Sequence, residues 1–190
     1  MWPWEHLAVG YLTYSLARRA VTGRAPARVE AYAVLLGSQF PDLVDKPLGW
    51  GTSLLPSGVS LAHSLLVAVP LAAVATVVTS NRGRRELGAA FAVGYLLHLP
   101  ADALYPALLG GNVYTDFLLW PLVPVPSESV PSIVGHLQEL IAHFLEVLAT
   151  PAGAAYLVLE ALLLGSALAL WILDGHPGVP RRTTTPEPAR

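Results

Sequence analysis

The segment GYLLHLPADALYP, residues 94–106, carries a histidine and an aspartate in an otherwise apolar stretch. In a helix, His98 and Asp102 would lie on one face, because residues four apart are neighbours there. Ionisable groups are costly in hydrocarbon, so this pair needs a compensating partner. A divalent cation would provide it, bound by both side chains or by an imidazole that the acid orients. Pro100 lies between them and would either kink the helix, opening room for a substrate, or spoil the spacing.

Further candidate ligands lie near the ends of other apolar segments, in WEHLAV, FPDLVDKP and SLAHSLL. Three His and two or three Asp, without any Cys, form a nitrogen and oxygen ligand set that suits Zn, Mn or Fe. Asp45 would act as a general base, or as a residue that orients a ligand. Read individually, each His could be an ordinary core residue, and Asp42 and Asp45 could be turn or cap residues. Together they predict a divalent metal site, most simply for Zn, with these ligands: His6, Asp42, His63, His98 and Asp102.

The composition indicates a membrane protein. Of 190 residues, 54% are hydrophobic and 13% are charged, about half the usual charged share of a soluble domain. The chain has no cysteine, which excludes disulfides and thiolate metal sites. A net charge of -2 argues against nucleic acid as a partner. The start, MWPWEH, lacks the basic region of a signal peptide, so we expect insertion through the helices themselves.

The hydropathy pattern predicts an all-α, multi-pass membrane bundle with about five hydrophobic helices and one amphipathic interfacial helix. The fifth hydrophobic helix is long enough to cross the hydrocarbon layer, whereas the first two have short apolar cores and are either full spans or half-buried helices. We expect one membrane-embedded domain, 1–175, and a disordered polar tail, 176–190. The hydrophobic helices are expected at 4–20, 29–44, 60–80, 86–105 and 154–173.

The charges predict an orientation in the membrane. If the five helices alternate, every Lys and Arg except Lys46 falls on one side. The positive-inside rule then places the C-terminus in the cytoplasm and the N-terminus outside, at the cytoplasmic (plasma) membrane. Trp2, Trp4 and Trp120 fit an aromatic belt on the outer side. This topology gathers the candidate ligands at the outer ends of their helices.

Two further polar features have competing interpretations. In HLQELIAHFLEVL, residues 136–148, two His and two Glu share one face, which favours an interfacial helix; a second metal site is the sharper alternative. Glu160 interrupts the last hydrophobic helix and is expected to face the bundle.

Four segments carry a resemblance to a known family: WEHLAVGYLTY, LLGSQFPDLVD, SLAHSLL and GYLLHLPADALYP with the LLWPL that follows. In order and spacing, across roughly residues 4–122, they resemble the YdjM-like membrane-bound metal-dependent hydrolases. The resemblance implies a small prokaryotic inner-membrane protein, distantly similar to zinc-dependent phospholipase C in helical fold and metal-site pattern. The family pattern matches the candidate ligands, Asp45 and Ser64. It departs at Ser57 and Gly58, where the family commonly carries His-Arg.

These features predict a membrane-embedded metal-dependent hydrolase whose site lies near the outer membrane face. A metal-bound hydroxide would attack a phosphoester or related bond. A lipid-linked substrate is expected from the depth of the site, with the lipid bilayer as the surrounding partner. The alternative is a non-catalytic membrane protein that acts as a metal-binding, small-solute or interaction module. The absent His-Arg favours this alternative, whereas the gathering of polar groups at one end favours a site over a pore.

Overall fold

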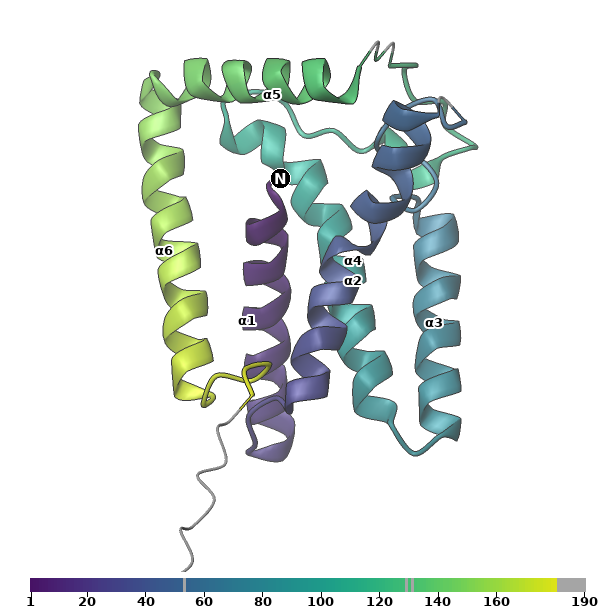
Figure 1. Ribbon diagram of the computed structural model, residues 1–190, viewed down its shortest axis with the longest axis vertical. Coiled ribbons are helices and arrows are strands. Elements are labelled where there is room, and N and C mark those ends of the chain that lie inside the picture. Colours follow the sequence, from purple (N-terminus) through teal and green to yellow (C-terminus); the bar gives the residue numbers. More distant parts are fainter. Residues whose placement is uncertain (53, 129, 131, 181–190) are drawn as a thin grey trace, which may run out of the picture.

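The computed structural model describes residues 1–52, 54–128, 130 and 132–180, and it is built of helices (Figure 1). Two short helical turns, η1 (Pro47–Gly51) and η2 (Asp116–Leu119), lie between the longer elements. No strand occurs in the described residues, so the predicted all-α class is confirmed. The predicted helices appear within three residues of their expected bounds, except that the third begins at Leu65 instead of residue 60, which leaves His63 in the loop before it. The six α-helices are α1 (Pro3–Thr22), α2 (Arg28–Lys46), α3 (Leu65–Asn81), α4 (Arg85–Leu108), α5 (Ile133–Leu148) and α6 (Pro151–Leu173).

Five helices alternate in direction along the longest axis of the molecule (Figure 1). These are α1, α2, α3, α4 and α6, whereas α5 lies across one end of the bundle. The central element is α4, which packs against α1, α2 and α3, while α6 packs along α1. Since α4 carries His98 and Asp102, the helix with the most extensive packing is also the one that carries the paired candidate ligands.

Glycines allow α2 and α4 to approach until their backbones touch. A Cβ atom at Gly37 would lie 2.2 Å from the carbonyl oxygen of Phe91, and one at Gly94 would lie 2.6 Å from that of Val34. A Cβ atom at Gly10 of α1 would lie 3.4 Å from the Cα of Gly94. Only glycine fits the first two positions, and this contact sets how closely the ligands on α2 and α4 can meet.

The exposed surface of α6 is that of a helix in lipid. Leu157, Val158, Leu162 and Leu168 are all about half exposed or more, and few residues of this helix are buried. Of the described helices, α4 and α6 are long and apolar enough to cross a bilayer, and α3 is apolar but has only 17 residues. The prediction that all five alternating helices cross the membrane therefore stays a prediction.

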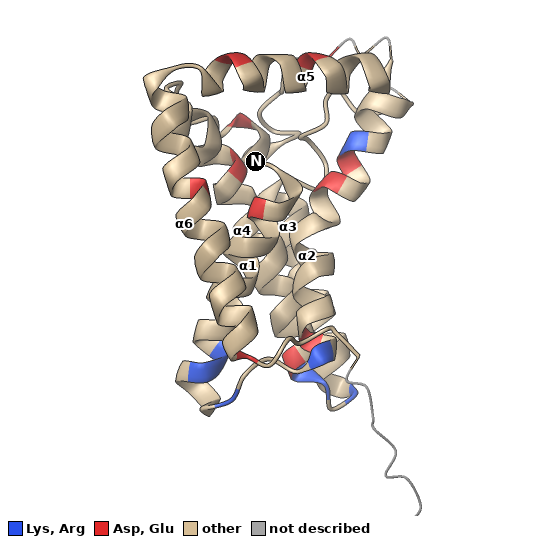
Figure 2. Ribbon diagram, turned by 60° about the vertical axis from the view of Figure 1, so that its left-hand side comes forward, with Lys and Arg blue, Asp and Glu red and all other residues tan. Residues whose placement is uncertain are grey.

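Lys and Arg gather at the end of the bundle opposite α5 (Figure 2). Arg18 pairs with Glu30 at this end. The carboxylate of Asp174, at the end of α6, accepts hydrogen bonds from Tyr11 (2.6 Å), Ser15 (2.6 Å) and the Nε of Arg19 (2.8 Å). These contacts fasten the last turn of α6 to α1 within this basic end. Three basic residues of the predicted distribution lie outside the described residues: Arg181, Arg182 and Arg190.

The predicted disordered tail falls partly within the structure. Residues 176–180 turn back onto the bundle, where Tyr32 donates a hydrogen bond to the carbonyl of Gly178 (2.6 Å) and Trp171 donates one to that of Pro177 (3.0 Å). The remainder, 181–190, lies outside the described residues.

Replacing Gly94 by Ala is expected to destabilise the protein. The new methyl group would meet backbone atoms of α2, which cannot shift independently of their helix, and overpacking of this kind costs about 1–3 kcal/mol. We expect a lower midpoint of thermal unfolding for Gly94→Ala in detergent. The matched control is Gly165→Ala on α6, where a Cβ atom meets nothing within 4 Å. If both variants unfold at the same temperature, the α2–α4 contact is not the constraint described here.

Candidate metal centre

Four segments bring ionisable side chains together at the end of the bundle that α5 crosses (Figure 1). They are the first turns of α1, the last turns of α2, the loop before α3 and the C-terminal half of α4. Two His and two Asp come close enough to hold one ion, with one possible ligand atom from each lying within 4.8 Å of the others: Asp42, His63, His98 and Asp102. These four predicted ligands therefore converge.

The Nε2 atom of His63 lies at the centre of this group. It is 3.1 Å from Nε2 of His98, 3.5 Å from Oδ1 of Asp42 and 3.3 Å from Oδ2 of Asp102. Nε2 of His98 is 3.2 Å from Oδ2 of Asp102 and 3.8 Å from Oδ1 of Asp42. In a tetrahedral site with bonds of about 2.0–2.1 Å, ligand atoms are separated by about 3.3 Å. The spacing of the four residues fits a small divalent cation.

Pro100 does not interrupt α4, which runs unbroken through both ligands. His98 and Asp102 keep the spacing of one helical turn, as their 3.2 Å contact requires. Of the two consequences considered for Pro100, loss of the i, i+4 geometry does not occur.

Asp45 holds His63 in place and is itself fully buried. Its carboxylate accepts backbone hydrogen bonds from Ser60 (2.8 Å), Ala62 (2.9 Å) and His63 (3.2 Å). It also lies 2.8 Å from Nδ1 of the His63 ring. A carboxylate that accepts from Nδ1 fixes the imidazole tautomer with Nε2 free to bind a cation. Asp45 thus lies one step outside the cluster, and its predicted role as a general base stays a prediction.

His98 is oriented by a backbone carbonyl, which the sequence does not reveal. Its Nδ1 lies 2.7 Å from the carbonyl oxygen of Ser38, on the α2 turn before Asp42. Both cluster imidazoles therefore present Nε2 inwards and have Nδ1 satisfied by an oxygen from α2.

His6 lies against the cluster as a fifth candidate. Its ring stacks on that of His98, with centroids 3.6 Å apart, and its Nε2 lies 3.1 Å from Oδ1 of Asp102. The Met1 amine also donates to this oxygen. Neither ring nitrogen of His6 and neither oxygen of Asp42 has the geometry of a hydrogen bond, although all are buried and Oδ2 of Asp42 has the Lys46 ammonium group 2.6 Å away. Because buried polar atoms are nearly always paired, these atoms are suited to a cation, although ligation by His6 itself stays a prediction.

Three carboxylates surround the His63 ring in a nearly closed space. Burial alone would lower the pKa of His63, but its contacts with Asp102, Asp42 and Asp45 raise that pKa to about 10. These carboxylates favour a positive charge at His63, which a metal ion bound at Nε2 could supply in place of a proton. Sequence reasoning missed Lys46, whose Nζ lies 2.6 Å from Oδ2 of Asp42; their i, i+4 spacing was the available signal.

Trp50 and Glu128 contact the loop at the position where the family pattern carries His-Arg. A Cβ atom at Gly58 would lie 2.6 Å from Nε1 of Trp50, so the indole covers this turn. Glu128 accepts hydrogen bonds from Trp50 (2.6 Å) and from the Gly58 backbone (3.1 Å). In this chain the loop is thus held by the Trp50 indole and the Glu128 carboxylate.

The α5 polar face gives no support to a second metal site. His136 lies 3.9 Å from Glu139, and His143 lies 4.0 Å from Glu146, with both Glu side chains exposed to more than 80%. Within the described part of the chain, the two-His, two-Asp cluster is the only group with metal-ligand spacing. Glu160 does find a partner, since its Oε1 accepts a hydrogen bond from Trp4 (2.8 Å).

Fold and cluster together define a class: an apolar, all-helical protein with a buried histidine and aspartate site that could hold a metal ion. The chain belongs to the YdjM inner membrane protein family, whose sequence profile matches residues 1–176. The resemblance found from the four sequence segments is thereby confirmed, and membership supports a membrane location. No curated protein and no solved structure matches the chain.

Replacing Asp45 by Asn is expected to weaken metal binding although Asp45 is not among the four clustered residues. The amide would lose the charge that fixes the His63 ring, and changes to such orienting residues typically cost about 10- to 100-fold in metal affinity. Competition with a chromogenic zinc chelator, using detergent-purified protein, measures this loss. Asp116→Asn, at an exposed aspartate in η2, is the matched control and should leave the affinity unchanged. Equal affinities for the two variants would contradict the role assigned to Asp45.

Proposed function

We propose that this protein is a membrane-embedded metal-dependent hydrolase that cleaves a phosphoester or related bond near the outer face of the membrane. The observation that carries the proposal is the convergence of Asp42, His63, His98 and Asp102, each from a different turn or helix. A bound cation, Zn in the simplest case and Mn or Fe otherwise, would activate water and polarise a phosphoryl oxygen. Catalysis itself is the proposed step.

The residues of the cluster and those around it would have different roles in the proposed site. Asp42, His63, His98 and Asp102 hold the cation, with His6 as a fifth ligand beside Asp102. The hydrogen bonds of Asp45 support the orienting role over the general-base role, because both its oxygens are occupied by backbone N–H groups and the His63 ring. The stacked and buried imidazoles exclude bulk water from the inner side of the site.

A lipid phosphoester is the proposed substrate class. The amphipathic α5 lies across the same end of the bundle (Figure 1), and it leaves Val134, Leu137, Ile141 and Leu145 exposed. An amphipathic helix of this kind suits the boundary between headgroups and acyl chains. A site directly beneath it would lie at the depth of a lipid phosphate.

Metal analysis and turnover test the proposal together. Detergent-purified protein should retain about one zinc or manganese per chain, and His98→Ala should lose it because the cluster loses a nitrogen ligand. Hydrolysis of bis(p-nitrophenyl) phosphate should also be lower for His98→Ala than for the parent protein, because the variant has lost the metal. His143→Ala removes an exposed imidazole, 75% accessible, and should change neither quantity.

The non-catalytic alternative is favoured by one feature, the replacement of His-Arg by Ser57 and Gly58. Metal at stoichiometric amounts without turnover of any phosphoester would support a metal-binding module instead. If the parent protein binds no metal, both the hydrolase proposal and the metal-binding module are wrong.

The proposed orientation places the N-terminus and the metal centre outside and the C-terminus in the cytoplasm. It is supported by the arginines at the end opposite α5 (Figure 2) and by the positive-inside rule.

The absence of native cysteine allows a direct test of orientation. Asn112→Cys lies in an exposed loop near α5, whereas Arg24→Cys lies at the basic end. In intact spheroplasts, a membrane-impermeant maleimide should label the first variant, and it should label the second only after permeabilisation. The reverse pattern would invert the topology and place the metal centre on the cytoplasmic side.

A further inference from the structure

The metal centre has a partly accessible edge at Asp42 and Lys46. The side chains of His6, His63, His98 and Asp45 are fully inaccessible. The accessible surface of the centre comes from Asp42 (9% of its side chain) and Asp102 (12%), beside the more exposed Lys46 (29%). Lys46 is thus the most accessible charged side chain in contact with the centre.

Lys46 is held at this edge by two contacts. It lies one helical turn after Asp42 on α2, and its Nζ is 2.6 Å from Oδ2 of that residue. Nζ also lies 5.5 Å from the centroid of the Trp50 ring, within the range of a cation–π contact. The ammonium group is thus fixed beside a proposed metal ligand, while almost a third of the side chain remains accessible.

The charge around the site makes this ammonium group important for anions. Three carboxylates, Asp42, Asp45 and Asp102, carry three negative charges, against which stand a divalent cation, Lys46 and the Met1 amine. With Lys46 the site would carry one net positive charge that attracts an anion, and without Lys46 it would carry none. Among the described residues, the other Lys and Arg side chains lie at the far end of the bundle (Figure 2). The Met1 amine already pairs with Asp102.

We propose that Lys46 and the cation held beside it at Asp42 form a binding site for a phosphoryl group. Lys46 contacts the phosphoryl oxygens directly, as a point-charge donor, and directs the anion to the accessible edge of the cluster. This inference rests on the proposed function, because it requires the cation. It identifies the chemical class of the ligand as an anionic phosphate, either free or part of a lipid headgroup.

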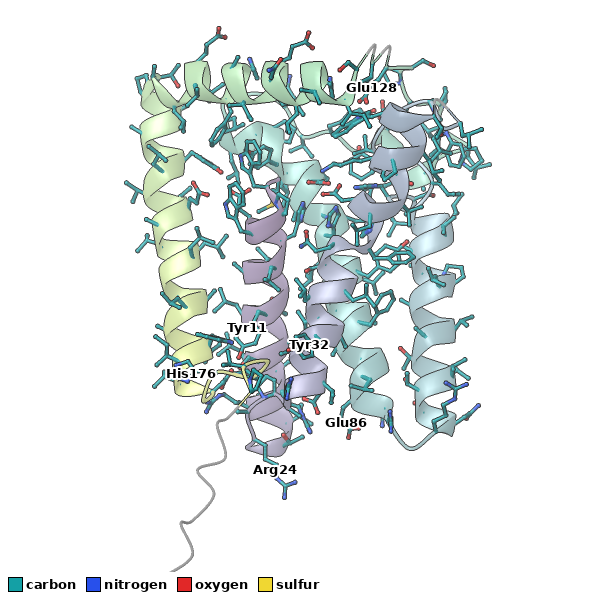
Figure 3. All side chains as sticks on the ribbon, in the orientation of Figure 1. Tyr11, Arg24, Tyr32, Glu86, Glu128 and His176 are labelled. Carbon is teal, nitrogen blue, oxygen red and sulfur yellow. The ribbon has the colours of Figure 1, made fainter. Side chains whose placement is uncertain are left out.

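Phosphate binding to zinc-loaded protein in dodecyl maltoside tests the proposal. We expect Lys46→Met to weaken the binding of inorganic phosphate, measured by isothermal titration calorimetry, by about 10- to 100-fold, the weight of one charge-assisted hydrogen bond. Lys46→Arg should restore most of the affinity. Arg24 projects away from the bundle at the end opposite α5 (Figure 3). Arg24→Met therefore removes one positive charge far from the site, and this variant should bind phosphate as tightly as the parent protein.

The zinc content of each variant separates this proposal from the one on which it rests. If the parent and Lys46→Met hold equal zinc and bind phosphate equally, the Lys46 site is wrong and the metal centre stands. If the parent holds no zinc, the proposed function fails and the Lys46 site fails with it. Should Lys46→Met not fold, Lys46→Gln is measured in the same way, and a merely structural role would lower its unfolding midpoint without changing phosphate affinity.

Lipid competitors identify the source of the phosphate. Displacement of inorganic phosphate by phosphatidic acid, but not by diacylglycerol, would support a lipid headgroup as the ligand. No effect of either lipid, with phosphate binding still dependent on Lys46, would support free phosphate. Equal competition by the two lipids would show that the phosphoryl group is not recognised and would overturn the proposal.

Discussion

The structure depends on compensating the charge of three carboxylates in a nearly closed, apolar setting. An unpaired carboxylate would be costly there, so each has a specific set of partners. Asp45 takes three backbone N–H groups and a ring nitrogen, Asp42 takes Lys46 and His63, and Asp102 takes three imidazoles and an amine. The same contacts that neutralise the charges also create the ligand geometry, so stability and proposed chemistry share one set of interactions.

The close packing of α2 and α4 makes this arrangement possible. At Gly37 and Gly94 the two helices meet backbone to backbone, which brings the carbonyl of Ser38 within 2.7 Å of the His98 ring. A wider separation would take Asp42 away from His98 and leave that ring nitrogen without an acceptor. The apolar contact in the middle of the bundle therefore controls the polar contact at its end.

The sequence predicted the helices and the converging ligands because both follow from periodicity and from side-chain type. His98 and Asp102 share a helical face, and the alternation of helices brought Asp42 and His63 to the same end. The carbonyl of Ser38 carries no side-chain signal, and its role depends on the tertiary contact at Gly94. Likewise, the backbone donors to Asp45 come from the fold of a loop, which hydropathy does not describe. Lys46 was readable from its i, i+4 spacing but was used only to assign orientation.

The distribution of the cluster along the chain has a consequence for biogenesis. Its members extend from Asp42 on α2 to Asp102 on α4, so no earlier portion of the nascent polypeptide contains a complete set. During synthesis, α2 and its aspartates are made before the imidazole of α4 exists to meet them. The proposed cation site, and the full stability of the first three helices, therefore require that α4 has been made.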